Sequence, residues 1–232
     1  MSLLLIAVAV AAADIAAGLI FMNPRLANIL STRYILAFAA SALLTLAFVE
    51  IIPEANLAVN AWYLALGFGG FYLLDKFLPS RLGNEKNTVT RSGMGLSSVI
   101  AMASDNITDG VAIAVGYLLS PELGVLMTLV VVLHELPQGI TSAAIMKSLR
   151  FKLRTIITIL AVAGSMYIVG ISLSGFIPQE FFSVIMAFVA GSFLYTGSRF
   201  LITQARNINT RFIATILMGI ITMYLLESII SV

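Results

Sequence analysis

The chain has 232 residues, of which 60% are hydrophobic and only 10% are charged, and its net charge is +2. This composition is too apolar for a soluble domain, so we expect a lipid bilayer as the surroundings and no nucleic-acid partner. The absence of cysteine excludes disulfides and thiolate metal ligands.

Eight apolar stretches approach the length of about 20 residues that a helix needs to cross a bilayer. In chain order they cover residues 2–22, 34–52, 60–79, 94–119, 122–146, 155–177, 180–203 and 211–231. The connections between them are short. The sequence therefore predicts an all-α polytopic membrane protein with eight transmembrane helices, in which residues 1–232 form a single transmembrane domain.

The first stretch has the small residues of a signal-peptide cleavage site but lacks a basic segment before it. Its first basic residue, Arg25, follows the apolar run, which is the wrong flank for a cleaved signal. We therefore interpret 2–22 as a retained helix.

The basic residues fall only in alternate connections. All 13 lie at the first, third, fifth and seventh connections: Arg25, Arg33, Lys76, Arg81, Lys86, Arg91, Lys147, Arg150, Lys152, Arg154, Arg199, Arg206 and Arg211. By the positive-inside rule these connections are cytoplasmic. Both termini are then expected outside.

The two ends of the chain resemble each other. Residues 40–44 match 190–194, and Gly67 with the run 72–75 matches Gly219 with the run 224–227. The matching helices point in opposite directions under the predicted topology. This pattern predicts an inverted three-helix repeat, about 1–79 and 155–232, around a central helix pair at about 94–147, which is a 3+2+3 arrangement. Inverted repeats with a site at the middle of the membrane are typical of transporters.

Two polar motifs lie in the middle of the central pair. The first is Asp105-Asn106-Ile107-Thr108-Asp109-Gly110, and the second is His134-Glu135-Leu136-Pro137-Gln138-Gly139. In each motif the first and last polar residues are four apart and share one helix face. Carboxylates inside a membrane cost about 2.5–3.5 kcal/mol each, so they indicate function. Imidazole, carboxylate and amide groups together predict a divalent-metal site of Asp105, Asn106, Asp109, His134, Glu135 and Gln138.

Other interpretations of the motifs remain open. The polar groups could join helices without metal, or relay protons. His134-Glu135 matches the start of the H-E-x-x-H helix of zinc proteases, but the second histidine position holds Gln138 and the chain has no other histidine. We therefore expect no enzyme and no organic cofactor.

Three further acidic residues are weaker candidates for the ion pathway. Glu50 and Glu54 lie near the predicted outer end of the second helix, where they could attract cations or simply be solvated. Asp14 lies in the middle of the first helix and either lines the pathway or bonds a neighbouring helix. Asp75 and Glu227 occupy matching repeat positions, and we expect them to be structural.

These motifs make the chain resemble the ZIP family of divalent metal transporters. The family patterns H-N-x-x-D-G and H-E-x-P-x-E-G are similar to the motifs at 105–110 and 134–139, and the family pattern L-L-P-E is similar to residues 51–54. The resemblance, which extends to the pattern at 190–195, implies eight transmembrane helices with both termini outside. It also implies a movement of helices 1, 4, 5 and 6 against helices 2, 3, 7 and 8.

The resemblance implies one metal position lined by Asp105, His134 and Gln138, and a neighbouring one lined by Asn106, Asp109, Glu135 and Gln138. Two residues depart from the family: Asp105 stands for a histidine, and Gln138 for a glutamate that can bridge two metals. A neutral amide is a poor bridge, which argues against a full binuclear site. The carboxylate at 105 favours Mn²⁺ or Fe²⁺ relative to a histidine-rich site, with zinc still open.

The sequence thus predicts transport of a divalent zinc-, iron- or manganese-class ion, with import toward the cytoplasm implied by the family. Two alternatives stay open: a non-transporting homologue that senses metal or holds a structural ion, and a transporter of another solute on the same fold. We expect an integral protein of the cytoplasmic membrane of a prokaryote, and a homodimer is left open.

Overall fold

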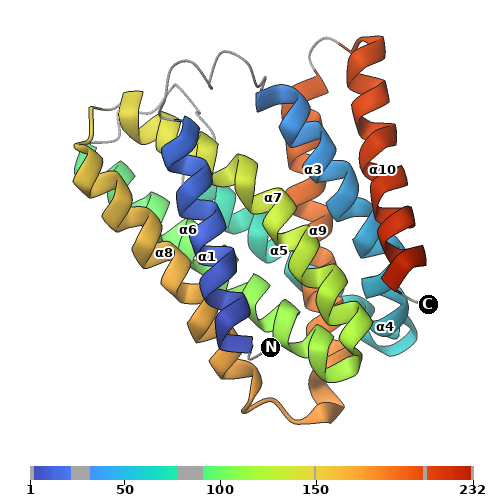
Figure 1. Ribbon diagram of the computed structural model, residues 1–232. Helices are drawn as coiled ribbons and strands as arrows, with labels where there is room; N and C mark the ends of the chain where they lie inside the picture. Colours follow the sequence, from blue (N-terminus) through green and yellow to red (C-terminus); the bar gives the residue numbers. More distant parts are fainter. Residues whose placement is uncertain (1–2, 22–31, 78–90, 149, 206–207, 231–232) are drawn as a thin grey trace.

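The computed structural model describes residues 3–21, 32–77, 91–148, 150–205 and 208–230, and these residues form helices and their connections, without a strand (Figure 1). Arg25, Arg81, Lys86 and Arg206 lie outside the described residues. The long helices are α1 (Leu3–Phe21), α3 (Thr32–Leu46), α5 (Leu57–Phe77), α6 (Arg91–Leu119), α7 (Pro121–Ser148), α8 (Leu153–Ser174), α9 (Phe182–Gln204) and α10 (Thr210–Ile230). The predicted all-α polytopic fold is confirmed.

Seven helical spans in the described part are long and apolar enough to cross a membrane. They are Leu3–Ile20, Arg33–Glu54, Leu57–Phe77, Pro121–Ile140, Leu153–Ser174, Gln179–Gln204 and Thr210–Ile230. The other long helix, α6, has 29 residues and carries the first polar motif in its middle. The eight predicted stretches therefore correspond to eight long helical segments.

The second span changes its helical geometry near one end. After α3 comes one π-helical turn, η1 (Ala47–Ile51), and then the short α4 (Ile52–Glu54). Pro53 has no N–H and its ring crowds the preceding turn, so the helix widens before it. Asn56 then adopts a positive φ of 46°, a conformation that asparagine tolerates, and the chain reverses into α5.

The helices pack as two groups. The first bundle consists of α1, α6, α7 and α8, in which α1 and α6 each contact both α7 and α8. The second bundle consists of α3, α5, α9 and α10, in which α9 contacts α5 and α3, and α3 also contacts α10. Figure 1 shows α1 and α8 on the left and α3, α9 and α10 on the right.

These contacts agree with the predicted inverted repeat. If α3 corresponds to α9 and α5 to α10, then the α3–α10 contact corresponds to the α9–α5 contact, and both are extensive. Exchanging α1 with α8 and α6 with α7 likewise turns the α1–α7 contact into the α8–α6 contact. The 3+2+3 repeat stays a prediction that the packing supports.

Glycines allow the backbones to approach within each bundle. A Cβ at Gly67 of α5 would collide with the carbonyl oxygen of Phe188 in α9, and one at Gly110 of α6 would lie 2.6 Å from the carbonyl oxygen of Tyr167 in α8. In a membrane, lipid is as apolar as the side chains, so such close packing replaces the hydrophobic effect as the main attraction between helices.

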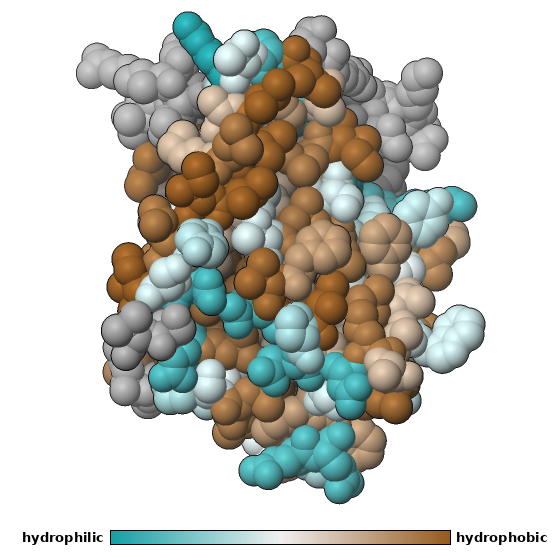
Figure 2. Space-filling view, turned by 90° about the vertical axis from the view of Figure 1, so that its right-hand side faces the viewer, coloured by the Kyte–Doolittle hydropathy of each residue, from teal (hydrophilic) through white to brown (hydrophobic). Residues whose placement is uncertain are grey.

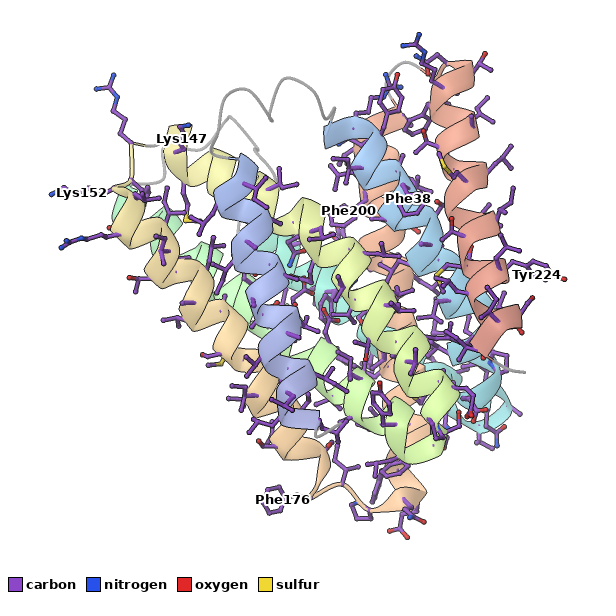
Figure 3. The ribbon with its side chains drawn as sticks, in the orientation of Figure 1. Phe38, Lys147, Lys152, Phe176, Phe200 and Tyr224 are labelled. Carbon is purple, nitrogen blue, oxygen red and sulfur yellow. The ribbon has the colours of Figure 1, made fainter. Side chains whose placement is uncertain are left out.

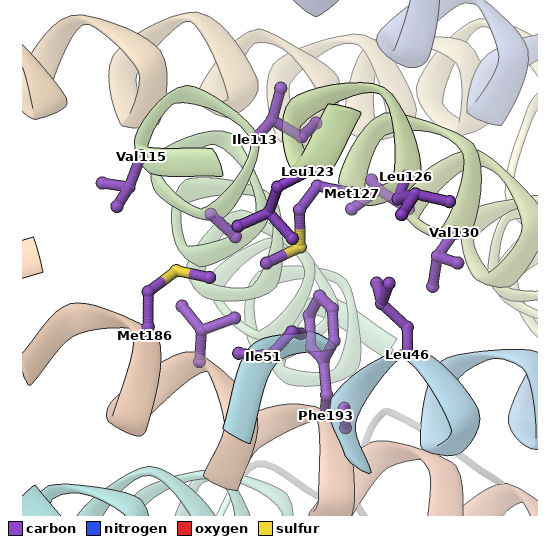
Figure 4. Packing of buried hydrophobic residues seen from close by; sticks show 14 of the residues in the cluster. Leu46, Ile51, Ile113, Val115, Leu123, Leu126, Met127, Val130, Met186 and Phe193 are labelled. Carbon is purple, nitrogen blue, oxygen red and sulfur yellow. The ribbon is translucent and has the colours of Figure 1, made fainter. Parts of the chain in front are cut away.

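Apolar side chains fill the interface between the two bundles. Figure 4 shows residues of α6 and α7 facing residues of α3, η1 and α9. The buried side chains include Leu46, Ile51, Ile113, Met127, Val130, Met186 and Phe193. This interface lies beside the central pair and therefore beside the polar motifs.

The ends and the outer surface suit a membrane protein. Lys147 and Lys152 lie at one end of the molecule, and Phe176 lies at the opposite end (Figure 3). The side view in Figure 2 is dominated by hydrophobic residues, and its hydrophilic residues gather toward the end that carries Phe176. Exposed side chains such as Trp62, at 81%, and Ile229, at 71%, are suited to contact with lipid.

Candidate metal centre

The polar residues of α6 and α7 come together in the interior of the first bundle. The two helices contact each other, and all six predicted site residues are buried, with exposed fractions of 0–8%. The spacing of four residues within each motif places two side chains on one helix face, one turn apart. Their burial shields these groups from bulk solvent.

His134 is held in one orientation by the backbone of its own helix. Its Nδ1 lies 3.0 Å from the carbonyl oxygen of Val130. A carbonyl oxygen only accepts, so this contact is a hydrogen bond when Nδ1 carries the proton. Its ring also packs edge-on against Phe193 of α9, with centroids 5.7 Å apart. The imidazole is therefore fixed with Nε2 directed away from Val130.

That Nε2 faces two carboxylates. It lies 3.2 Å from Oδ2 of Asp109 and 3.2 Å from Oε1 of Glu135. When Nδ1 is the protonated nitrogen, the lone pair of Nε2 and the two carboxylate oxygens repel one another unless a cation lies among them. That cation is either a second proton on the ring or a metal ion.

Asp109, His134 and Glu135 therefore form a candidate three-ligand cluster. One ligand atom from each residue lies within 4.8 Å of the others, and all three side chains are buried. One imidazole nitrogen with carboxylate oxygens is a donor set for Zn²⁺, Mn²⁺ or Fe²⁺. The cluster is small enough for a single ion to touch all three groups.

Gln138 links the cluster to Asp105. Its Nε2 donates hydrogen bonds to Oδ2 of Asp105 and to Oε1 of Glu135, both at 3.0 Å. The amide nitrogen thus lies between two carboxylate oxygens. Rotation of this amide by half a turn would present its oxygen there instead, which suits a metal.

The contacts of His134 differ from the two positions that the resemblance implied. His134 was grouped with Asp105 and Gln138, but its Nε2 contacts Asp109 and Glu135, which were assigned to the neighbouring position. Asn106 is fully buried, and neither polar atom of its side chain has a hydrogen-bond partner in the described part of the chain. The assignment of all six residues as metal ligands stays a prediction.

The three weaker candidates for the ion pathway lie in two different places. Asp14 of α1 is fully buried and interacts electrostatically with Glu135 and His134, so it adjoins the cluster. Glu50 is half-buried in η1 and Glu54 is exposed in α4, and Glu50 interacts electrostatically with Glu54 and Glu227. These glutamates lie near the end of the second span, outside the buried cluster, and their role at an entrance stays a prediction.

Sequence reasoning missed Tyr167 of α8. The side chain is fully buried, and its hydroxyl interacts with Glu135, Asp109 and Asp14. The predicted repeat contained a signal for its position. The offset of 152 that relates Gly67 to Gly219 carries Asp14 to residue 166, which is next to Tyr167.

A comparison with protein families shows to which family the chain belongs. A family model described as ZIP Zinc transporter matches residues 83–227, which include both polar motifs. The chain belongs to the ZIP family. Its predicted resemblance is thereby confirmed.

Two curated ZIP relatives share less than 30% identity with this chain. "Zinc transporter ZIP13" of Pongo abelii is 29% identical over 133 residues, which cover 49% of this chain and 39% of the relative. "Zinc transporter YKE4" of Saccharomyces cerevisiae is 25% identical over 168 residues, which cover 62% of this chain and 49% of the relative. The chain thus spans less than half the length of these relatives.

Proposed function

We propose that this ZIP-family chain transports divalent transition-metal ions across a membrane and binds them between α6 and α7. The observation that carries the proposal is the buried group of Asp109, His134 and Glu135, whose ligand atoms lie within 4.8 Å of one another. A histidine nitrogen facing two carboxylates in an apolar bundle needs a cation for balance. A metal ion supplies more charge than a proton does.

The zinc class is the first candidate for the ion, because the relatives are named as zinc transporters. The donor set is harder than a histidine-rich one, since His134 is the sole histidine. Oxygen ligands favour Mn²⁺ and Fe²⁺ relative to a site with several imidazoles. We therefore propose a substrate range that includes Mn²⁺ and Fe²⁺ beside Zn²⁺.

Transport is proposed to proceed by movement of the first bundle against the second, toward the cytoplasm. The packing supports this mechanism, because the candidate ligands all lie on α6 and α7 within one bundle and the facing surface is apolar. An apolar interface has few hydrogen bonds to break when it slides. The ions would travel with the moving bundle.

Purified protein in proteoliposomes provides the test. Uptake of Zn²⁺, Mn²⁺, Fe²⁺ and Mg²⁺ should be measured separately, and anomalous diffraction should locate any ion retained. Uptake of transition metals but not Mg²⁺ is expected. Binding without uptake would favour a homologue that senses metal or holds a structural ion. Uptake of an unrelated solute alone would favour a transporter of another solute on the same fold.

The proposed orientation, with both termini outside, can be tested with single introduced cysteines because the chain contains none of its own. Single cysteines at positions 84 and 151 should resist a membrane-impermeant thiol reagent added outside sealed cells. Cysteines at positions 56 and 121 should react, since they lie in connections without Lys or Arg. Labelling at position 84 from outside would reverse the proposed orientation and the direction of transport with it.

A further inference from the structure

A groove of about 300 Å³ opens on the outer surface of the second bundle. Residues of α3, η1, α9 and α10 line it, including Leu44, Phe48, Leu201, Ile216 and Ile220. Leu44 lies about 200° around α3 from Leu46, a side chain that packs in the interface between the bundles. The groove therefore faces away from the first bundle, toward the surroundings of the protein.

The groove presents only apolar surface, although two of its residues carry hydroxyl groups. Thr45 donates a hydrogen bond of 2.8 Å to the carbonyl oxygen of Ser41, and Ser41 donates one of 2.9 Å to that of Phe38. Both hydroxyls are thus satisfied within α3. The lining residues Phe48 and Val49 are 61% and 50% exposed. An open apolar lining of this kind suits a hydrocarbon chain, which the membrane supplies at this depth.

Two arginines lie where the helices α3 and α10 begin. Both helices start at the end of the molecule that carries Lys147 and Lys152, and they pack against each other (Figure 1, Figure 3). Arg33 is the second residue of α3, and Arg211 is the second residue of α10. The N-terminus of a helix is the positive end of its dipole, so each arginine adds to a positive charge that is already there. Two such ends side by side attract an anion.

The Arg33 side chain connects this charge to the groove. Its guanidinium lies over the Phe212 ring of α10, with the Cζ atom 4.8 Å from the ring centroid. Phe212 shares one face of α10 with Ile216 and Ile220, which follow after four and eight residues and line the groove. The charged end and the apolar groove therefore belong to the same seam between α3 and α10.

A third arginine of the second bundle has a different environment. Arg199 lies near the C-terminus of α9, where the helix dipole favours a cation, and it pairs with Asp75. Among the described residues, Asp75 is the one acidic side chain at this end of the molecule. The exposed Arg211, at a helix N-terminus, is instead placed to meet an anion from the membrane surface.

We propose that the seam between α3 and α10 binds one anionic phospholipid, with an acyl chain in the groove and the headgroup phosphate at Arg33 and Arg211. Basic residues between transmembrane helices near the membrane surface bind anionic headgroups in this way. A guanidinium matches the geometry of a phosphate, to which it donates two hydrogen bonds. From Arg33 to Ser41, α3 rises about 12 Å. One leaflet of the hydrocarbon core is about 15 Å thick, so a single chain spans this distance.

Native mass spectrometry of the purified protein tests the proposal, with dioleoyl-phosphatidylglycerol and dioleoyl-phosphatidylcholine as probes. Wild type should bind one phosphatidylglycerol about tenfold or more tightly than phosphatidylcholine, since two basic residues contribute. Arg33→Gln/Arg211→Gln should reduce this preference to within about twofold. Ile220→Trp should fill the groove and weaken the binding of both lipids. Arg154→Gln is the matched control and should keep the wild-type preference, because Arg154 is also the exposed second residue of a helix, α8, in the first bundle.

The other outcomes contradict the proposal. Equal affinities for the two lipids in wild type, or an unchanged preference in the double arginine variant, would overturn the binding of the headgroup. Unchanged phosphatidylglycerol binding in Ile220→Trp would overturn the role of the groove. Lipid-independent dimers that disappear in Ile220→Trp would assign the groove to a second copy of the chain. The arginine variants leave the groove itself intact, so they decide the question even if Ile220→Trp does not fold. No metal is added, so the result does not depend on the proposed transport.

Discussion

The two bundles differ in what lies beside their carboxylates. In the second bundle, Asp75 of α5 pairs with Arg199 of α9 and accepts a hydrogen bond of 2.7 Å from the Tyr195 hydroxyl. In the first bundle, Asp14 and Asp109 have no lysine or arginine among their described partners. A carboxylate that has its own cation needs no further ion. The difference is that Asp75 is neutralised by a side chain of its own bundle, whereas Asp14 and Asp109 have no lysine or arginine of that kind among the described residues.

The glycines of the two bundles also differ in the groups against which they pack. Gly67 of α5 packs against backbone atoms of Phe188, so its role is close helix contact alone. Gly139 of α7 packs against the carboxylate and backbone of Asp14, so its role is to admit a charged side chain. Similar close approaches thus hold the second bundle together and shape the candidate site of the first.

The largest expected effect comes from removing ligands of the cluster. His134→Ala and Glu135→Ala should each reduce metal uptake by at least about 100-fold, since even outer-shell partners contribute about 10–100-fold to metal sites. The variants should still insert, because removal of a buried polar group eases membrane insertion. Uptake in proteoliposomes is the measurement, and retained monodispersity in detergent shows folding.

The ion pair of the second bundle provides a control for those variants. Asp75→Asn removes a partly buried carboxylate charge of the second bundle, where it has its own arginine. Its metal binding should stay within about twofold of wild type. Uptake that is normal in both cluster variants would contradict the central-pair site, whereas loss of binding in Asp75→Asn would contradict the division of roles between the bundles.

The next effect is on stability and concerns the second bundle. Asp75→Ala should lower the free energy of unfolding by about 2 kcal/mol, because it leaves Arg199 without its carboxylate and Tyr195 without its acceptor. Both members of the ion pair are about one-sixth exposed, which keeps the loss below that of a fully buried pair. Thermal unfolding in detergent measures this loss. An unchanged melting temperature would show that the pair contributes no net stability.

Most of the fold was predictable from the sequence, and the reason is physical. Every span in lipid must satisfy its own backbone hydrogen bonds, so apolar length alone identifies a helix. The six candidate ligands were visible because polar residues are rare in such runs. Asp14 was visible as a charge, but its neighbours were not, since they depend on how α1 crosses α7 at Gly139.

Two features needed three-dimensional information. Tyr167 has an ordinary aromatic character in sequence, and only its burial and its electrostatic interaction with Glu135 and Asp14 place it beside the candidate site. The partners of His134 also depended on rotation of α6 relative to α7, which spacing within each motif does not determine. Sequence periodicity fixes which residues share a face of one helix, and it leaves open which face of the neighbour they meet.

A smaller effect distinguishes packing glycines from exposed ones within α5. Gly67→Ala should lower the free energy of unfolding by about 1–3 kcal/mol, as overpacking does, since its Cβ would lie 3.1 Å from the Cα of Phe188 and closer to its carbonyl oxygen. Gly69→Ala, two residues along the helix, has no heavy atom within 4 Å of the added Cβ and should be neutral or slightly stabilising. Equal melting temperatures for the two variants would show that the α5–α9 contact adapts easily.

The smallest expected effect is a change of metal preference in the first bundle. Asp105→His replaces a carboxylate that accepts from Gln138 Nε2 at 3.0 Å with an imidazole. The amide of Gln138 can rotate to present its oxygen to the new ring. A nitrogen of the introduced imidazole then becomes available near Glu135, in addition to that of His134. Imidazole favours Zn²⁺ over Mn²⁺, so the ratio of Zn²⁺ to Mn²⁺ affinity should rise severalfold. Competition titration of both metals measures it, with Asp105→Asn as the control for charge loss alone. An equal rise in both variants would mean that charge at position 105, and not ligand type, sets the preference.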